Sequence, residues 1–131
     1  MEISAYELAG GERAFSELAA AFYRQVLADP LMLPLFERPD DDHAGRMALF
    51  LGEYFGGPAE HTRLRGGNAT MAHIHDGLRI SGRQRDRWIE HMHAACEEVQ
   101  IPDAFMAHFE PMMQHFAPIA QEESWRSGRF L

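Results

Sequence analysis

The apolar residues of this 131-residue chain recur mostly every three or four positions, which is the spacing of one face of an α-helix. Such stripes predict helices over residues 2–9, 12–28 and 43–55, and again after Ser81 and after Pro102. No segment shows the sustained period-two alternation that is typical of a half-buried strand. The chain is therefore predicted to be all-α.

Several predicted helices begin at residues that provide a start signal. Three consecutive aspartates, residues 40–42, supply N-cap candidates and favourable negative charge for the helix over 43–55. Ser81 and Gln84 have the spacing of a capping box, so a helix is predicted to begin at Ser81. Residues 59–69 contain Gly-Gly-Asn and are predicted to be a loop.

The last helical region carries two prolines within its apolar pattern. Pro111 and Pro118 each cost about 3 kcal/mol in a helix interior, so a kink or a break is predicted near Glu110. Residues after Glu122 are predicted to form a loose tail. The length and the 46% hydrophobic content fit a single domain over residues 1–131 with a substantial core.

The charge balance narrows the kinds of partner. Twelve Lys and Arg against twenty Asp and Glu give a net charge of -8, which argues against nucleic acids and anionic membranes. No apolar run approaches the roughly 18 residues that a membrane span needs. A single cysteine and a polar, acidic start favour the cytoplasm. A small neutral or gaseous partner fits this composition better than a polyanion.

The chain contains eight histidines, an unusually high number for its length, and two of them are predicted to lie next to apolar helix faces. His43 heads the face of the helix over 43–55. His75 precedes the connection to the helix that starts at Ser81, whose apolar face begins with Trp88. His75 and the Trp88 face can therefore share one pocket.

Three kinds of chemistry remain open for these histidines. In the first alternative the histidines are structural side chains, and each ring nitrogen is satisfied by a backbone carbonyl or water. Alternatively, His73 and His75 form a zinc or two-metal site with His43, but residues two apart on a helix diverge by about 200°. No Glu-x-x-His pair and no cysteine partner support such a site.

The third reading is haem ligation, which needs one neutral imidazole on iron, polar groups on the opposite side and bulky apolar walls. The polar candidates are Tyr23, His43 and Trp88. The wall candidates are Phe36, Met47, Phe50, Leu51, Met71, Leu78 and Trp88.

Four motifs in a fixed order extend this reading. They are FYxxV from Phe22, FLxxYxGGP from Phe50, HxxxRI from His75 and RDxW from Arg85. With them the chain resembles the truncated haemoglobins, most closely their second group, over nearly its whole length. The resemblance implies a shortened globin fold, a two-over-two sandwich of helices around haem b.

The resemblance also implies roles for individual residues. His75 matches the proximal iron ligand, and His73 is its nearest rival. Tyr23 and Trp88 match the distal donors of hydrogen bonds to a bound ligand. His43 and Met47 face the ligand from the distal helix, and Phe36 packs on the porphyrin. Haem propionates would pair with Arg46, and with Arg65 or Arg79.

Four positions depart from the family pattern, and one of them is Pro111, which is expected to make the last helix irregular. His43 stands where many second-group members have a small residue, and Phe36 where some have tyrosine. Ile74 stands just before the proximal histidine, where an arginine is frequent. Distal hydrogen bonding therefore need not copy that of the family, and the propionate is bound by another basic side chain or by none.

The resemblance implies reversible binding of O2, CO and NO at a five-coordinate iron. Two enzymatic alternatives stay open. A nitric oxide dioxygenase would require a separate reductase as partner, and a peroxidase-like protein would use His43 as its acid–base group. Monomer and homodimer are both compatible with the sequence.

Overall fold

The computed structural model describes residues 3–36, 42–65 and 78–125. Within these ranges the chain forms six α-helices, one 3-10 helix and no strand. The elements are α1 (Ala5–Ala9), α2 (Gly11–Leu27), η1 (Leu33–Phe36), α3 (His43–Tyr54), α4 (Glu60–Arg65), α6 (Gly82–Glu98) and α7 (Asp103–Glu123). The all-α prediction is confirmed.

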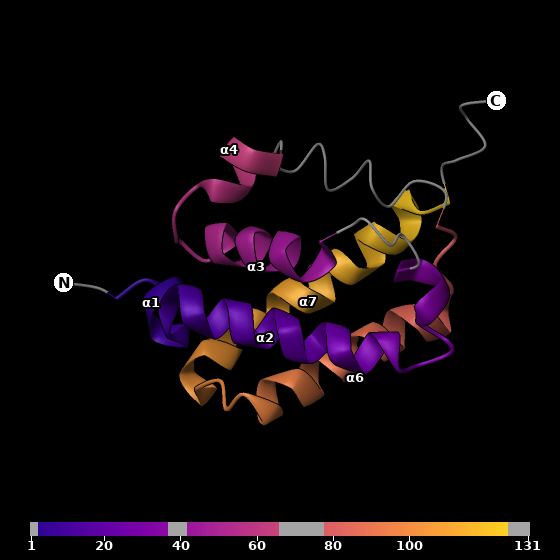
Figure 1. Cartoon of the computed structure of the whole chain (residues 1–131), viewed down its shortest axis with the longest axis horizontal. Helices are drawn as coiled ribbons and strands as arrows, with labels where there is room; N and C mark the ends of the chain where they lie inside the picture. Colours follow the sequence, from indigo (N-terminus) through magenta and orange to yellow (C-terminus); the bar gives the residue numbers. More distant parts are fainter. Residues whose placement is uncertain (1–2, 37–41, 66–77, 126–131) are drawn as a thin grey trace.

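The four longest helices form two antiparallel pairs, α2 with α3 and α6 with α7 (Figure 1). Because α2 also packs along α6, one pair lies against the other. The short helix α1 contacts both α2 and α7, and η1 turns back onto α2. This is the two-over-two arrangement that the sequence predicts.

The predicted helix starts are confirmed by their hydrogen bonds. The hydroxyl of Ser81 accepts from the backbone N–H of Gln84 at 3.0 Å, and the Gln84 side chain accepts from the Ser81 N–H at 2.9 Å. The carboxylate of Asp42 likewise accepts from the N–H of Gly45 at 2.9 Å. These bonds satisfy N–H groups that have no partner within the helix.

An aromatic cluster joins the two helix pairs at the centre of the core. The ring of Phe15 on α2 stacks on Tyr6 of α1 at 5.5 Å and meets Phe105 of α7 edge-on at 5.6 Å. The largest side chains with under 2% exposure are Phe15, Phe22, Phe105, Phe109, Leu18, Met32, Leu51, Met92, Met113, His61 and Val26. Burying one large apolar side chain contributes about 1.5–3 kcal/mol, so the burial of these apolar side chains stabilises the fold strongly.

Helix α4 corrects the prediction of a loop over residues 59–69. Residues 60–65 are helical, and residues 66–69 lie outside the described ranges. The carboxylate of Glu53 accepts from the N–H of Thr62 at 2.8 Å and from its hydroxyl at 2.5 Å. His61 is buried against Phe50, with ring centroids 5.4 Å apart. A six-residue helix held by such tertiary contacts is too short to show a periodic pattern.

Of the kink or break predicted near Glu110, the break is wrong, because α7 is continuous from Asp103 to Glu123 with both prolines inside it. The kink stays a prediction. Both prolines lie on the exposed side of the helix. Four buried side chains, Phe105, Phe109, Met112 and Met113, hold the opposite side. Their burial offsets the roughly 3 kcal/mol cost of each proline.

The end of α7 is fastened to the segment before α6. The buried hydroxyl of Ser124 accepts from the N–H of Ile80 at 2.8 Å, and the Ser124 carbonyl accepts from the N–H of Arg79 at 2.9 Å. The indole N–H of Trp125 donates to the Ile80 carbonyl at 2.9 Å. Ser124 and Trp125 are thus anchored where the sequence predicts a loose tail, and residues 126–131 lie outside the described ranges.

Candidate functional site

The described part of the chain contains one side of the predicted site. His75, His73 and Met71 lie outside the described residues, as does the side chain of Arg65. The remaining site residues are distributed over α2, η1, α3, α6 and the segment before α6. They are Tyr23, Phe36, His43, Arg46, Met47, Phe50, Leu51, Leu78, Arg79 and Trp88.

Three of these residues form an aromatic triad that joins three elements. The Tyr23 ring stacks on the His43 ring, with centroids 5.6 Å apart and planes inclined by 21°. Phe36 meets Tyr23 at 5.2 Å and His43 at 5.3 Å, edge-on in both cases. Offset stacking and edge-to-face contacts are the favoured aromatic geometries. The structure therefore brings Tyr23, Phe36 and His43 together, as a shared distal site requires.

Trp88 joins this group through a core ring. Phe22 is fully buried, and its ring lies 5.0 Å from Tyr23 and 5.5 Å from Trp88 between centroids. Tyr23 and Trp88, on α2 and α6, thus rest on the same side chain. Two donors from different helices are held in one neighbourhood by the packing of the core.

Five half-buried side chains of the predicted site, which we call the apolar wall, come from four elements. They are Tyr23, Phe36, Met47, Phe50 and Trp88, and they pack against the core. The core residues beneath them are almost completely buried, so the wall is the outer layer of the apolar interior. A flat apolar group can cover such a surface, and the phenol, imidazole and indole provide polar atoms beside it.

Two predicted wall residues differ from the others in burial. Leu51 is only 1% exposed and belongs to the core, so it has almost no surface to offer a cofactor. Leu78 is half-buried in the segment before α6.

The arginines predicted to bind propionates have different surroundings. Arg46 is half-buried on α3, one turn after His43. The guanidinium of Arg79 lies over the Trp125 ring, 5.8 Å from its centroid, which is cation–π geometry. Arg79 also has a left-handed backbone, with φ of 53°.

A polar cluster around Asp29 is the main feature that the sequence analysis missed. Oδ2 of Asp29 lies 2.8 Å from Nη1 of Arg87 and 2.7 Å from Nε2 of His91. Oδ1 accepts from the N–H of Leu31 at 3.0 Å. The hydrogen bond to His91, with those from Leu31 and Arg87, lowers the pKa of Asp29 although burial opposes the shift.

This cluster has a sequence signal that is visible only once the fold is known. Gln84, Arg87 and His91 stand at i, i+3 and i+7 on α6, which places them on one helix face beside Trp88. In the sequence without the fold, Asp29 before Pro30 indicates only the end of a helix. His91 cannot then be distinguished from the other histidines that are interpreted as structural.

The metal alternative receives no support from the described residues. No group of three His, Cys, Asp or Glu side chains in those ranges could hold a metal ion. The pair His73 and His75 lies outside them and is not tested. Burial, with a smaller effect of the Glu110 charge, raises the pKa of the Cys96 thiol to about 12, so this thiol stays neutral and a poor ligand.

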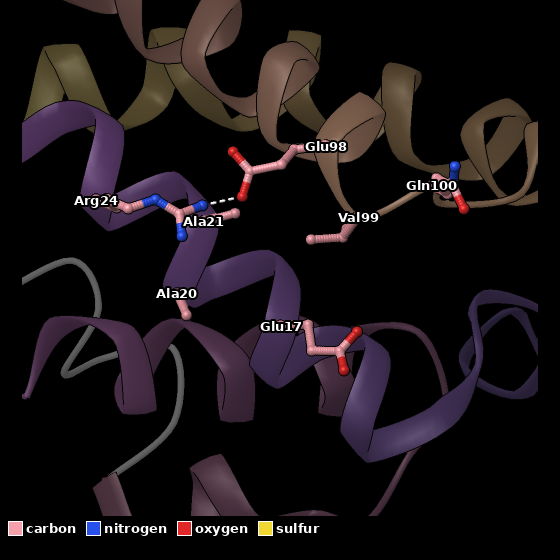
Figure 2. A pocket seen from close by; sticks show the side chains of 7 residues that line it. All are labelled: Glu17, Ala20, Ala21, Arg24, Glu98, Val99 and Gln100. Atoms are coloured by element: carbon pink, nitrogen blue, oxygen red, sulfur yellow. Dashed lines mark hydrogen bonds and ion pairs between the residues drawn. The ribbon is translucent and has the colours of Figure 1, made fainter.

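A separate hollow lies between α2 and the end of α6 (Figure 2). Its lining residues are Glu17, Ala20, Ala21, Arg24, Glu98, Val99 and Gln100. The guanidinium of Arg24 pairs with the carboxylate of Glu98 across it, and both side chains are largely exposed. The hollow contains no aromatic side chain and no histidine, so it lacks the chemistry of the wall.

In the described ranges, none of the helices is both long and apolar enough to span a membrane.

Comparison with known proteins identifies relatives of this chain. The family model of the bacterial-like globins matches residues 4–122. The chain is 32% identical over 111 residues to a group 1 truncated haemoglobin of Tetrahymena pyriformis, covering 84% of this chain and 88% of that protein. It is 32% identical over 91 residues to the group 2 truncated haemoglobin YjbI of Bacillus subtilis (strain 168), covering 70% and 68%. The crystal structure of a haemoglobin from Chloroflexus aurantiacus superposes with a TM-score of 0.83 at 34% identity, covering 91% of this chain and 98% of the other.

Proposed function

The chain belongs to the bacterial-like globin family and is a globin haem protein, and we propose that it binds O2, CO and NO reversibly at a five-coordinate haem b iron. The observation that carries this proposal is the aromatic triad of Tyr23, Phe36 and His43, with Trp88 held beside it by Phe22. The triad and the apolar wall together supply half-buried apolar side chains and polar atoms, which is what a haem face with a bound ligand requires.

The wall residues fit a haem group by their chemistry. Phe36, Met47 and Phe50 supply apolar contact, and Leu51 is left out of the proposed site because it is buried in the core. Bound haem supplies the iron that takes the diatomic ligand. His75 is proposed as the proximal ligand, with Met71 and Leu78 beside it. Arg46, and with it Arg65 or Arg79, is proposed to pair with the haem propionates.

Three donors are proposed to control how long the ligand stays bound. They are the phenol of Tyr23, the indole of Trp88 and the imidazole of His43. A charge-assisted hydrogen bond contributes roughly 1.5–3 kcal/mol, and each 1.4 kcal/mol is a factor of ten in rate or affinity. If all three donors engage the ligand, O2 release is slow, which suits reaction with O2 better than its transport.

A peroxidase-like activity is a second proposal, and the position of His43 favours it. This imidazole contacts two aromatic rings on the proposed ligand side, and its Nε2 atom is buried. A distal imidazole can move a proton to or from a bound substrate. A nitric oxide dioxygenase activity would need a separate reductase as partner, and such a partner is also proposed. The proposed location of the protein is the cytoplasm.

Absorption spectroscopy tests the proposed function directly. The purified protein is measured as ferric protein, after dithionite reduction, and after reduction under CO. A Soret band that shifts with CO is expected in the wild type and in the His73→Gly control, and is expected to be lost or altered in His75→Gly. If no Soret band stays with the protein after reconstitution with excess haem and removal of the unbound haem, the globin function is overturned.

A further inference from the structure

Asp29 lies where α2 ends and the chain turns toward η1, and it connects this corner to α6. Its side chain is 8% exposed and accepts three hydrogen bonds from two elements. The N–H of Leu31 binds Oδ1, and Arg87 and His91 both reach Oδ2. A nearly buried carboxylate with two charged or polar partners is costly to disrupt, because removal of one group leaves the others without their partner.

Two glutamine side chains extend this connection on both sides. Nδ1 of His91 lies 3.2 Å from Oε1 of Gln25 on α2. Nε2 of Gln84 donates to the backbone carbonyl of Leu31 at 3.0 Å. Three side chains of α6 thus bind residues 25–31 by hydrogen bonds over two helical turns. We call Asp29, Arg87 and His91, with Gln25 and Gln84, the corner clamp.

The corner clamp lies around Trp88 on the same stretch of α6. Residues 84, 87 and 91 stand four before, one before and three after Trp88, so they lie within about one helical turn of it. The indole packs on Phe22 of α2 at 5.5 Å. Rotation of α6 about its axis would displace the indole from Phe22, and the hydrogen bonds of the corner clamp oppose that rotation.

We propose that Asp29, through Arg87 and His91, is a positioning residue that holds Trp88 in the orientation in which its indole N–H donates to a ligand in the distal site. This inference rests on the proposed function. Asp29 itself acts only through Trp88 and does not contact the ligand.

Both ring nitrogens of His91 have a neighbour in the corner clamp. Nε2 donates to the Asp29 carboxylate, and Nδ1 lies beside the side-chain amide of Gln25. Arg87 also lies 3.3 Å from the exposed carboxylate of Glu90 and keeps its charge in all conditions of interest.

The test compares Asp29→Asn with Glu98→Gln in the haem-loaded protein. Both variants remove one carboxylate charge between α2 and α6, but Glu98 pairs with Arg24 at the far end of α6 (Figure 2). Asp29→Asn is expected to raise the O2 dissociation rate about threefold to tenfold, less than full loss of a donor. It should also broaden or split the infrared stretching band of bound CO, which senses nearby donors. Glu98→Gln is expected to change neither quantity.

A double-mutant cycle shows whether the effect passes through Trp88. In the Trp88→Phe background, Asp29→Asn is expected to change O2 dissociation less than about twofold. The same factor in both backgrounds, or an unchanged rate and CO band in Asp29→Asn, would overturn the positioning role. If Asp29→Asn does not fold, His91→Gln is expected to give a smaller change in the same direction, and no change would again overturn it.

Failure of the proposed function gives a different result. If the wild type takes up no haem, positioning is tested on that haem-free protein in the Trp125→Phe background, where Trp88 is the remaining indole. Acrylamide is then expected to quench Trp88 fluorescence more strongly in Asp29→Asn than in Glu98→Gln. Equal quenching in the two variants would overturn the positioning role in that case as well.

Discussion

The Tyr23 ring on α2 stacks on the His43 ring on α3, with centroids 5.6 Å apart and planes inclined by 21°. Phe36 on η1 contacts both rings with its edge or face, so three elements meet at this triad. Aromatic pairs contribute about 0.5–1.5 kcal/mol beyond their buried area. A change in one ring of the triad therefore affects the placement of the other two.

Removal of either proposed distal donor is expected to speed O2 release. Tyr23→Phe keeps the stacked ring and loses the phenol O–H, and Trp88→Phe loses the indole N–H. Each lost charge-assisted hydrogen bond of roughly 1.5–3 kcal/mol corresponds to about a tenfold to hundredfold faster O2 dissociation. Stopped-flow mixing of the O2 complex with CO measures this rate.

The same chain offers a matched control for each substitution. Tyr54 and Trp125 are 47% and 55% exposed and lie outside the proposed site. Tyr54→Phe and Trp125→Phe are expected to leave O2 dissociation unchanged. If Tyr23→Phe and Trp88→Phe also leave it unchanged, the network of distal donors does not exist.

Two substitutions separate the ring of His43 from its nitrogen atoms. His43→Phe keeps an aromatic ring in the triad, whereas His43→Ala opens space beside Tyr23 and Phe36. O2 dissociation and any peroxide-dependent activity are expected to change in both variants, because both lose the imidazole. CO association is expected to accelerate only in His43→Ala, because loss of the ring opens the path of the ligand to the proposed haem iron. Flash photolysis of the CO complex measures association.

The ferric spectrum decides whether His43 stays off the iron. Since Tyr23 and Phe36 hold the imidazole in the triad, we expect a high-spin ferric spectrum in the wild type and in both variants. A low-spin wild-type spectrum that both variants lose would instead make His43 the sixth ligand.

Features of the fold that depend on neighbouring residues could be predicted from local signals in the sequence. The capping pair Ser81 and Gln84 predicts the start of α6 because both of its hydrogen bonds are made within four residues. The order of motifs around Tyr23 and Trp88 predicts the family, and the fold brings these residues to one core ring, Phe22. Periodicity and order along the chain carry this part of the information.

Features that depend on contacts between distant residues could not be predicted. Helix α4 exists because the Glu53 carboxylate binds Thr62 and because His61 is buried, and neither contact has a local signature. The continuity of α7 through Pro111 depends on apolar residues of other helices. The link from Asp29 to His91 spans 62 residues, so it becomes visible only when α2 and α6 are packed together.

The corner clamp is expected to make stability depend on pH in the acid range. His91, Leu31 and Arg87 lower the pKa of Asp29 below its ordinary value of 3.8. Between the lowered folded pKa and the unfolded pKa, the unfolded chain binds more protons, so stability falls as pH falls. The stabilisation is complete above the unfolded pKa and is lost as pH drops through the folded one.

Urea unfolding of the wild type and of Asp29→Asn at several pH values measures this contribution. The difference in free energy of unfolding between them is expected to be constant above about pH 5 and to shrink progressively below about pH 4. Taking the difference removes the parallel effect of Glu110, whose pKa is lowered mainly by its hydrogen bond to His93. A difference that stays constant to about pH 2 would mean that the Asp29 charge does not stabilise the folded state.

Gly57 is expected to be essential for packing after α3, whereas Gly82 is not. A Cβ atom on Gly57 would lie 2.5 Å from the Tyr6 ring and 2.8 Å from the carbonyl oxygen of Gly52. The ring cannot move freely, because it stacks on Phe15 in the core. Gly57→Ala should therefore lower the free energy of unfolding by about 1–3 kcal/mol, the usual cost of overpacking.

Gly82→Ala is the matched control for this substitution. A Cβ on Gly82 meets nothing within 4 Å, and this residue is the first of α6. Because alanine reduces the freedom of the unfolded chain, we expect unchanged stability or a gain of up to about 1 kcal/mol. Urea unfolding measures both variants. Equal effects of the two substitutions would mean that the contact between Gly57 and Tyr6 does not limit the packing of α1 against α3, since only Gly57→Ala disturbs that contact.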